Sequence, residues 1–343
     1  MMTFSGPQNI PYHGALQPLD VAAARTRDGW ICLANPLAPE GRLGWEERPG
    51  FSKLRHQSWL WRRHGALAVA CRRTNPRPVL IREFSSIPLL LWAPRFLSMR
   101  RRLYFLVNHN LQWAVSESAE RLAWRMLQRM GFRMVFFETR DLPLPTSYGL
   151  AHSRHGTIPF PMAARAAATA SRRAIPGSLP LVGVAGHARA EKDQAALVET
   201  LIAAGRGKWR VAVGASNPAA YPSSLREAGV SVRATMSAAE YESFLRDCDA
   251  IVIAPRECRY RYRPSGVLAD ALSVGTPGVA PDFPLFRSQL SVPCDVGEVF
   301  SRPEDLSGAV ERALSRRVAG EYDFEKYRAA RSPEAIARAL DDL

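Results

Sequence analysis

Cysteine is scarce in this sequence, and its spacing suits neither disulfide bonds nor zinc binding. The 343 residues include five cysteines, an odd number with no C-x-x-C pair: Cys32, Cys71, Cys248, Cys258 and Cys294. Disulfide frameworks and zinc sites both require paired spacings, so the pattern favours neither. We therefore expect free thiols in a reducing compartment.

Long hydrophobic runs are also missing. No apolar stretch approaches the roughly 18 residues that a membrane-spanning helix requires. The first 20 residues, MMTFSGPQNIPYHGALQPLD, lack the basic stretch and apolar core of a secretory leader. Apolar residues nevertheless make up 47% of the chain, which is typical of a folded globular protein. The sequence predicts a cytoplasmic protein.

Acidic residues are scarce in the first half alone. Residues 1–177 hold 25 Lys and Arg against 10 Asp and Glu, whereas residues 178–343 hold 21 against 22. Such an asymmetry indicates an anionic partner for the first half: nucleic acid, an anionic membrane surface, or an acidic or phosphorylated substrate. A merely solubilising basic surface is the alternative.

Short, continuously apolar runs alternate with helical segments in both halves. These runs are predicted strands, at 30–37, 66–71, 77–81, 103–109 and 133–139, and again at 181–185, 209–214, 230–234, 249–255 and 276–281. The clearest helix, 116–130, is predicted to begin after Ser116 as its N-cap. Strands that are apolar throughout imply parallel sheets covered on both faces. The sequence thus predicts an α/β protein with two Rossmann-like, doubly wound domains.

A Pro-rich, irregular stretch separates the two halves and sets the domain boundaries. It runs from about residue 140 to the turn AIPGSLP at 174–180. The predicted domains are 1–177 and 178–320, and residues 321–343 form a C-terminal helix that can cross back to the first domain.

Two segments of the second half contain the residue types expected of an anion-binding site. GVAGHARAEKD, residues 183–193, joins a strand to a helix through a loop that carries Arg189 and Lys192. In the second segment, Ser265 and Gly266 begin a helix whose first amides are free, with Asp270 one turn further on. A diphosphate suits the amides and cations, and a carboxylate can bind ribose hydroxyls. A solvated loop and an exposed helix are the structural alternatives.

These segments resemble those of the GT-B glycosyltransferases, in particular the large retaining (family 4-like) group of bacterial nucleotide-sugar-dependent enzymes. GVAGHARAEKD is similar to the G-R-x-x-x-x-K-G donor-phosphate loop of that group, and RVAVG to its L-x-I-V-G strand. TMSAAEYESFLRDCDAIVIAP and SGVLADALSVGTPGVAP resemble its two following conserved segments, and VNHNLQWA and HGTIPFPM resemble segments of its first domain. The resemblance covers most of residues 100–315.

The resemblance implies a fold, an activity and a site. The fold is GT-B, with 1–177 on the acceptor side and 178–320 binding the donor. The activity is transfer of a hexose from a nucleotide diphosphate sugar to a glycan or lipid-linked acceptor, in bacterial surface or exopolysaccharide biosynthesis, without a metal cofactor. The implied roles are donor diphosphate binding for Arg189, Lys192, Ser265 and Gly266, ribose binding for Asp270, and positioning of the sugar by His109.

The sequence departs from the family at the stretch RYRYR, residues 259–263. Tyr262 stands where the family has a Glu that contacts the donor sugar. Arg263 and its neighbouring arginines can bind phosphate or an acidic sugar, and a tyrosine can stack on a ring. We therefore include Tyr262 and Arg263 in the predicted donor site; the alternative is a solvent-facing loop.

Other partners and functions remain open at this point. Residues 85–105 combine an apolar segment with Arg100, Arg101 and Arg102, which indicates either peripheral contact with an anionic membrane or a core helix followed by a basic strand. A catalytically silent GT-B partner or nucleotide-sugar-binding subunit is the main alternative function. An epimerase would need carboxylates that we do not find, and no motif supports binding to nucleic acid.

Overall fold

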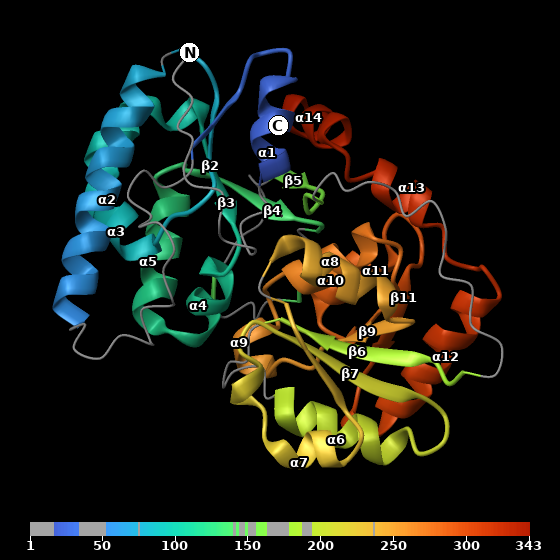
Figure 1. Ribbon diagram of the computed structural model, residues 1–343. Coiled ribbons are helices and arrows are strands. Elements are labelled where there is room, and N and C mark those ends of the chain that lie inside the picture. The colour runs from blue at the N-terminus through green and yellow to red at the C-terminus, as the bar shows by residue number, and fades with distance from the viewer. Residues whose placement is uncertain are drawn as a thin grey trace. The chain divides into compact units, whose positions relative to one another are not determined.

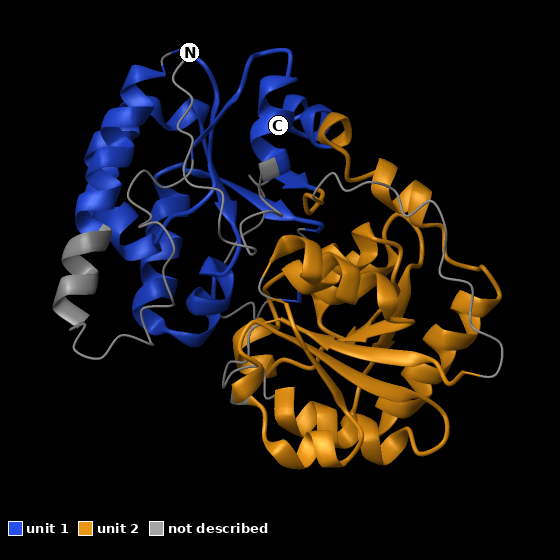
Figure 2. Ribbon diagram, in the orientation of Figure 1, with its two compact units in different colours: residues 1–158, 336–343 blue, residues 159–335 orange. Residues whose placement is uncertain are grey.

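The computed structural model describes residues 17–33, 53–74, 76–139, 142–143, 148–149, 156–162, 178–186, 194–235 and 237–343 (Figure 1). The chain forms two compact units, coloured separately in Figure 2. Unit 1 comprises residues 1–158 and 336–343, and unit 2 comprises residues 159–335.

Unit 1 is built on a parallel sheet. Its described strands are β1 (Ile31–Leu33), β2 (Val79–Ile81), β3 (Leu103–Val107), β4 (Arg133–Phe137) and β5 (Gly156–Ile158), in that spatial order. The β2, β3 and β4 side chains are almost all buried, as expected for strands covered on both faces. Around Phe105 on β3, aromatic rings pack edge to face, with Phe84 at 5.4 Å and Phe132 at 5.5 Å between centroids.

Unit 1 contains a long helix at residues 53–73, part of which the sequence analysis predicted as a strand. Its described helices are α1 (Gln17–Ala24), α2 (Lys53–Arg73), α3 (Ser86–Phe96), the 3₁₀ helix η3 (Leu97–Arg102), α4 (Asn110–Ser116), α5 (Ser118–Arg129) and the end of α14 (Pro333–Asp341). The predicted strand at 66–71 is wrong, because this run lies inside α2. His64, Leu67, Ala68 and Cys71 are buried at helical spacing, whereas Val69 is half exposed.

The predicted start of the helix at 116–130 is also wrong. Ser116 is the last residue of α4, and its hydroxyl donates back to the carbonyl of Gln112 at 2.9 Å. Glu117 takes the N-cap position of α5 in its place. Gly131 follows the helix with φ of +81°, which glycine adopts without strain.

Unit 2 contains a second parallel sheet, whose described strands lie in the order β11-β10-β9-β6-β7-β8. Their bounds are β6 (Leu181–Ala185), β7 (Arg210–Ala215), β8 (Ser231–Ala234), β9 (Ala250–Val252), β10 (Gly278–Pro281) and β11 (Gly297–Phe300). The chain returns from β8 to the far side of β6, so the strand order reverses beside β6. Ligands of open α/β sheets bind at such a switch point, outside the carboxyl ends of the strands.

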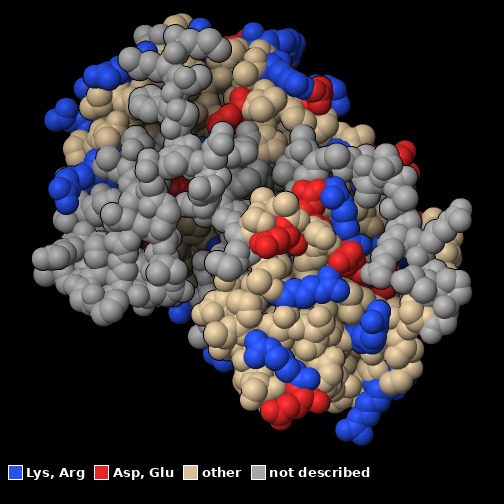
Figure 3. All heavy atoms as spheres, viewed as in Figure 1, with Lys and Arg blue, Asp and Glu red and all other residues tan. Residues whose placement is uncertain are grey.

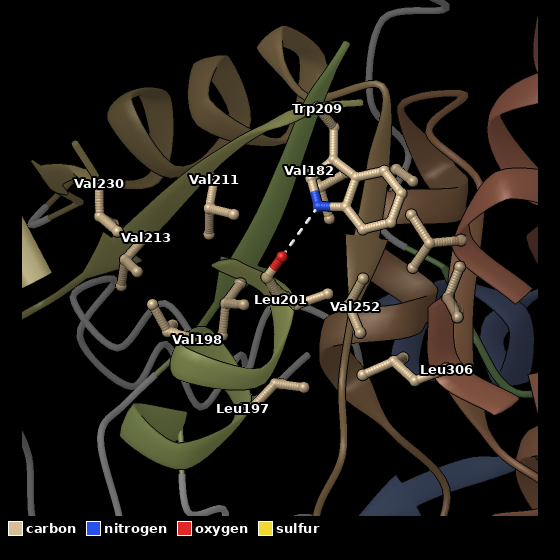
Figure 4. Close-up of a cluster of buried hydrophobic side chains, with 14 of the residues drawn as sticks. Val182, Leu197, Val198, Leu201, Trp209, Val211, Val213, Val230, Val252 and Leu306 are labelled. Carbon is tan, nitrogen blue, oxygen red and sulfur yellow. Dashed lines mark hydrogen bonds between the residues drawn. The ribbon is translucent and has the colours of Figure 1, made fainter. Parts of the chain in front are cut away.

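Helices complete unit 2 around an aliphatic core. They are α6 (Gln194–Ala204), η5 (Pro218–Ala220), α7 (Ser223–Glu227), α8 (Ala238–Asp247), α9 (Glu257–Tyr260), α10 (Gly266–Ser273), α11 (Pro284–Ser291), η6 (Pro303–Asp305), α12 (Leu306–Val318), α13 (Phe324–Ala329) and the start of α14. Figure 4 shows part of this core, in which the Trp209 indole donates a hydrogen bond to the carbonyl of Leu201 at 3.2 Å. No helix in the described part of the chain is long and apolar enough to cross a membrane.

The C-terminal residues of the chain pack on unit 1. The Asp341 carboxylate accepts a hydrogen bond from the Arg27 backbone N–H at 3.0 Å and lies 3.6 Å from its guanidinium. The Leu343 side chain contacts Gly156 on β5 so closely that no larger residue fits there without a shift. The last eight residues therefore belong to the first unit although they follow the second in sequence.

Candidate functional site: the start of helix α10 and the carboxyl edge of the first sheet

Ser265 is fixed at the start of α10 by hydrogen bonds from both directions. It is the N-cap residue, and its hydroxyl accepts the N–H of Leu268 at 3.3 Å. Its own N–H donates to Gln289 Oε1 at 2.8 Å, and its carbonyl accepts from Gln289 Nε2 at 3.2 Å. Gln289 is fully buried on α11. This side chain therefore clamps the first turn of α10 to the neighbouring helix.

The hydrogen bonds from the Gln289 side chain determine which backbone amides at the start of α10 remain for a ligand. The Ser265 N–H is occupied by Gln289, so the amides that remain at the helix start are those of Gly266 and Val267, which have no partner among the described residues. A Cβ added to Gly266 would meet no atom of the described residues within 4 Å. Free amides, the positive end of the helix dipole and open space together form a suitable anion site. Asp270 lies half-buried one turn along the same helix.

The RYRYR stretch is more structural than its composition indicates. It overlaps the short helix α9, and Tyr260 and Tyr262 are 6% and 4% exposed. Tyr260 belongs to the core cluster that also contains Phe286. The Arg263 guanidinium lies 4.9 Å from the Tyr260 ring centre, and Arg261 pairs with Glu257. The two tyrosines thus anchor the segment that leads into Ser265.

His109 lies just beyond the carboxyl end of β3. It is the N-cap residue of α4 and is half-buried, and its ring meets the Trp113 ring at 4.2 Å between centroids and 61° between planes. Asn110, the next residue, is buried and donates from Nδ2 to the Phe84 carbonyl at 2.7 Å. The imidazole is therefore held at the strand edge by its aromatic neighbour and by the anchored residue beside it.

Glu138 is a candidate that the sequence did not reveal. It follows β4 directly and has φ of +64°, a left-handed conformation that residues other than glycine adopt rarely. Val107 of β3 pairs with Phe136 of β4, so His109 and Glu138 each lie two residues past the last paired positions. Strained backbone of this kind clusters at active sites. The only sequence signal is a carboxylate directly after four buried strand residues.

Arg189 and Lys192 lie outside the described residues, but the two ends of their loop are described. Gly186 ends β6 with φ of +106° and donates to the Gly214 carbonyl at 3.3 Å. Gln194, the first residue of α6, donates from Nε2 to the Ala185 carbonyl at 3.1 Å and accepts from the Tyr221 hydroxyl at 2.8 Å. The strand end and the helix start are therefore joined by one buried side chain.

Two of the buried thiols, Cys71 and Cys248, are poor candidates for catalysis. Burial raises the pKa of Cys71 and of Cys248 to about 12, so neither is a thiolate at neutral pH. Within the described ranges no group of three or more His, Cys, Asp or Glu side chains is arranged to hold a metal ion.

Comparison with known proteins identifies the fold. No protein-family model matches the sequence, and no curated protein matches it. Among solved structures, HepE of Anabaena in complex with UDP is 12% identical, with 98% of this chain and 95% of HepE covered, at a TM-score of 0.59. The lipopolysaccharide outer core galactosyltransferase WaaB is 13% identical, with coverage of 84% and 79% and a TM-score of 0.57.

A third similar structure, TarM of S. aureus, is longer than this protein. It is 13% identical at a TM-score of 0.53, and the match covers 77% of this chain and 54% of TarM, so the chain spans about half the length of TarM. Two parallel-sheet units and these structural neighbours confirm the predicted fold, which is GT-B.

Proposed function

We propose that this protein is a glycosyltransferase that moves a hexose from a nucleotide diphosphate sugar to a glycan or lipid-linked acceptor. The observation that carries the proposal is the start of α10, where two free amides meet open space beside a clamped N-cap. The similar HepE structures contain UDP, in one case with glucose, so UDP is the first nucleotide to test.

In the proposed reaction the second unit holds the donor. The amides of Gly266 and Val267, together with Arg189 and Lys192, would stabilise the negative charge that develops on the leaving diphosphate. Asp270 would bind the ribose hydroxyls. These groups supply the charge stabilisation that a metal ion would otherwise give, so we propose a mechanism without a metal cofactor. With retention of configuration, the departing phosphate would assist attack on the same face of the sugar.

The first unit would handle the sugar and the acceptor. His109 would position the hexose, and Glu138 at the same sheet edge would accept a hydrogen bond from an attacking hydroxyl. The basic character of residues 1–177 suits an acceptor that carries phosphate or lies at an anionic membrane. We therefore propose a role in bacterial surface polysaccharide assembly, with the enzyme at the inner face of the membrane.

The test is a calorimetric titration with UDP, GDP, ADP and dTDP on the native protein and on Gly266→Ala. The new methyl group meets no atom in the described part of the chain, so we expect unchanged thermal stability. It would stand where a diphosphate must approach the amide, so we expect the Kd for the bound nucleotide to rise at least tenfold. Gly308→Ala, the same change near the start of α12, is the matched control and should leave the Kd unchanged.

Failure of all four nucleotides to bind would remove the donor site from the proposal, as would binding that Gly266→Ala leaves intact. Lys192→Ala extends the test to the loop at 187–193. Because the Lys192 charge would contact the diphosphate, its loss should weaken nucleotide binding without unfolding the protein.

A catalytically silent GT-B partner is the second candidate function. Burial of Tyr262, in the place where the resembling family has a sugar-contacting Glu, favours it. A silent protein would bind a nucleotide sugar tightly yet neither transfer nor hydrolyse the sugar. Release of UDP from UDP-hexoses, measured with and without acceptor extracts, separates the two candidates.

A further inference from the structure

Unit 1 contains a cavity at the end of its sheet opposite to His109. The cavity has a volume of about 340 Å³ and is lined by Arg72 at the end of α2 and by Ser98, Met99, Arg101 and Arg102 of η3. Arg102 directly precedes β3, whereas His109 follows it. The five residues of β3 span about 16 Å at about 3.3 Å per residue, so the cavity is separate from the sheet edge discussed above.

Basic residues far outnumber acidic ones in the described segment that surrounds this cavity. Residues 53–116 contain 12 Lys and Arg but a single acid, Glu83, and that carboxylate lies 2.6 Å from the Arg63 guanidinium. Lys and Arg side chains line the margin of the molecule where α2 lies (Figure 3). Neither Arg72 nor Arg101 makes a hydrogen bond or an ion pair with any residue that the structure describes. Like charges placed around one cavity repel each other unless an anion joins them.

Arg102 gives the cavity one fixed wall. Its guanidinium donates to the Cys71 carbonyl at 2.5 Å, to the Arg77 carbonyl at 3.0 Å and to the Thr74 hydroxyl at 3.2 Å. The bond to Cys71 satisfies a carbonyl in the last turn of α2, where a cation is favourable to the helix dipole. Arg102 is therefore positioned by the fold before any ligand arrives, and Arg72 and Arg101 line the same cavity.

We propose that this cavity binds a phosphate group, as a soluble phosphate ester or as the headgroup of an anionic lipid. Guanidinium groups match phosphate oxygens in planar, bidentate geometry, and the Ser98 hydroxyl adds a further donor. The volume lies at the small end of ligand pockets, which suits a phosphoryl group and its immediate substituent. The site is independent of the proposed glycosyl transfer, because it uses none of the residues of α10 or of the His109 edge.

The experiment compares two double variants of the full chain that each remove two positive charges. Arg72→Gln with Arg101→Gln removes the free arginines of the cavity, and neither change breaks a hydrogen bond. Arg73→Gln with Arg95→Gln is the matched control, because both side chains are exposed on α2 and α3 and neither lines the cavity. The probes are inorganic phosphate and pyrophosphate, followed by calorimetry, and vesicles of phosphatidylcholine with and without phosphatidylglycerol, followed by sedimentation.

The expected result is that the cavity variant binds one of these probes at least tenfold more weakly than the control variant. If only the binding of phosphate and pyrophosphate is weakened, the ligand of the cavity is a soluble phosphate ester. If only the binding of phosphatidylglycerol vesicles is weakened, the ligand is a lipid headgroup. Phosphate bound at α10 contributes equally to all proteins, because both variants leave unit 2 unchanged. Equal binding by the two variants, or no binding by the native protein, overturns the proposal.

Discussion

Replacing Gln289 by leucine removes the clamp on the first residue of α10. The side chain is fully buried and leucine fills a similar volume, so packing changes little. The substitution removes the acceptor of the Ser265 N–H, while the Ser265 carbonyl keeps its helical bond from Ala269 at 3.2 Å. The expected loss in the free energy of unfolding is therefore that of one buried donor left without a partner, about 1–3 kcal/mol.

Two measurements check this prediction. In a unit of this size each kcal/mol corresponds to about 2–4 °C in Tm, so the midpoint for unit 2 should fall by about 2–12 °C. Because the N-cap also orients the neighbouring amides, we expect Gln289→Leu to weaken nucleotide binding as well. Differential scanning calorimetry, followed by titration calorimetry with the nucleotide, measures both effects.

Tyr327→Phe, on α13, is the matched control, because the Tyr327 hydroxyl also bonds to Gln289. The Tyr327 hydroxyl donates to the Gln289 backbone carbonyl at 2.7 Å, and its loss leaves both bonds from the Gln289 side chain to Ser265 in place. This variant should lose stability of the same order, since it also removes one buried hydrogen bond, yet it should keep the nucleotide affinity. Native stability in Gln289→Leu, or equal loss of affinity in both variants, would refute the argument that the clamp orients the α10 amides.

Three further substitutions test other parts of the structure. Glu138→Gly should leave Tm unchanged or raise it, and should lower transferase activity. The substitution releases about 1–2 kcal/mol of strain from the left-handed backbone, whereas the added entropy of the unfolded chain costs about 0.4–1 kcal/mol. A lower Tm would contradict the presence of strain. Gly183→Ala should cost about 1–3 kcal/mol in urea unfolding, because the new methyl overlaps the Cys248 Sγ in the core. Burial raises the pKa of the Glu120 carboxyl above its usual value. The resulting contribution to stability is therefore present at low pH and disappears as pH rises through the raised pKa. Glu120→Gln should therefore be more stable than the native protein at pH 7 and equal to it near pH 4, as compared by urea midpoints.

Five of the six described strands of the second sheet were predicted from apolar runs, but β11 was missed, because only Phe300 of its four residues is buried. LVGVA at 181–185 is buried at every position, so the run and the strand coincide. The same signal failed at 66–71, where ALAVAC belongs to a long helix. A short apolar run does not distinguish a strand from one face of a helix. The helical spacing of the buried residues distinguishes the two structures, but it begins at His64, and the sequence gives no sign that this histidine is buried.

The candidate site was harder to predict because its decisive contacts are distant in sequence. The helix start at Ser265 follows from a local Ser-Gly signal, whereas the bond from Gln289 spans 24 residues. Glu138 carries no local preference for a positive φ, and the tertiary structure imposes that conformation. Tyr260 of RYRYR illustrates the same limit, since its burial depends on Phe286 and its neighbours in another helix.

The two proposed anion sites differ in the electrostatics that serve them. Residues 178–343 are close to neutral, so binding at α10 would rest on short-range hydrogen bonds from backbone amides and a few cations. The cavity beside Arg101 lies in a segment of 12 basic residues and one acid, so its ligand would also be drawn by the field of the whole segment. Salt screens such a field beyond about 8 Å at physiological ionic strength but weakens direct hydrogen bonds much less. Because the two contributions respond differently, raising the salt concentration should weaken phosphate binding at the cavity far more than nucleotide binding at α10.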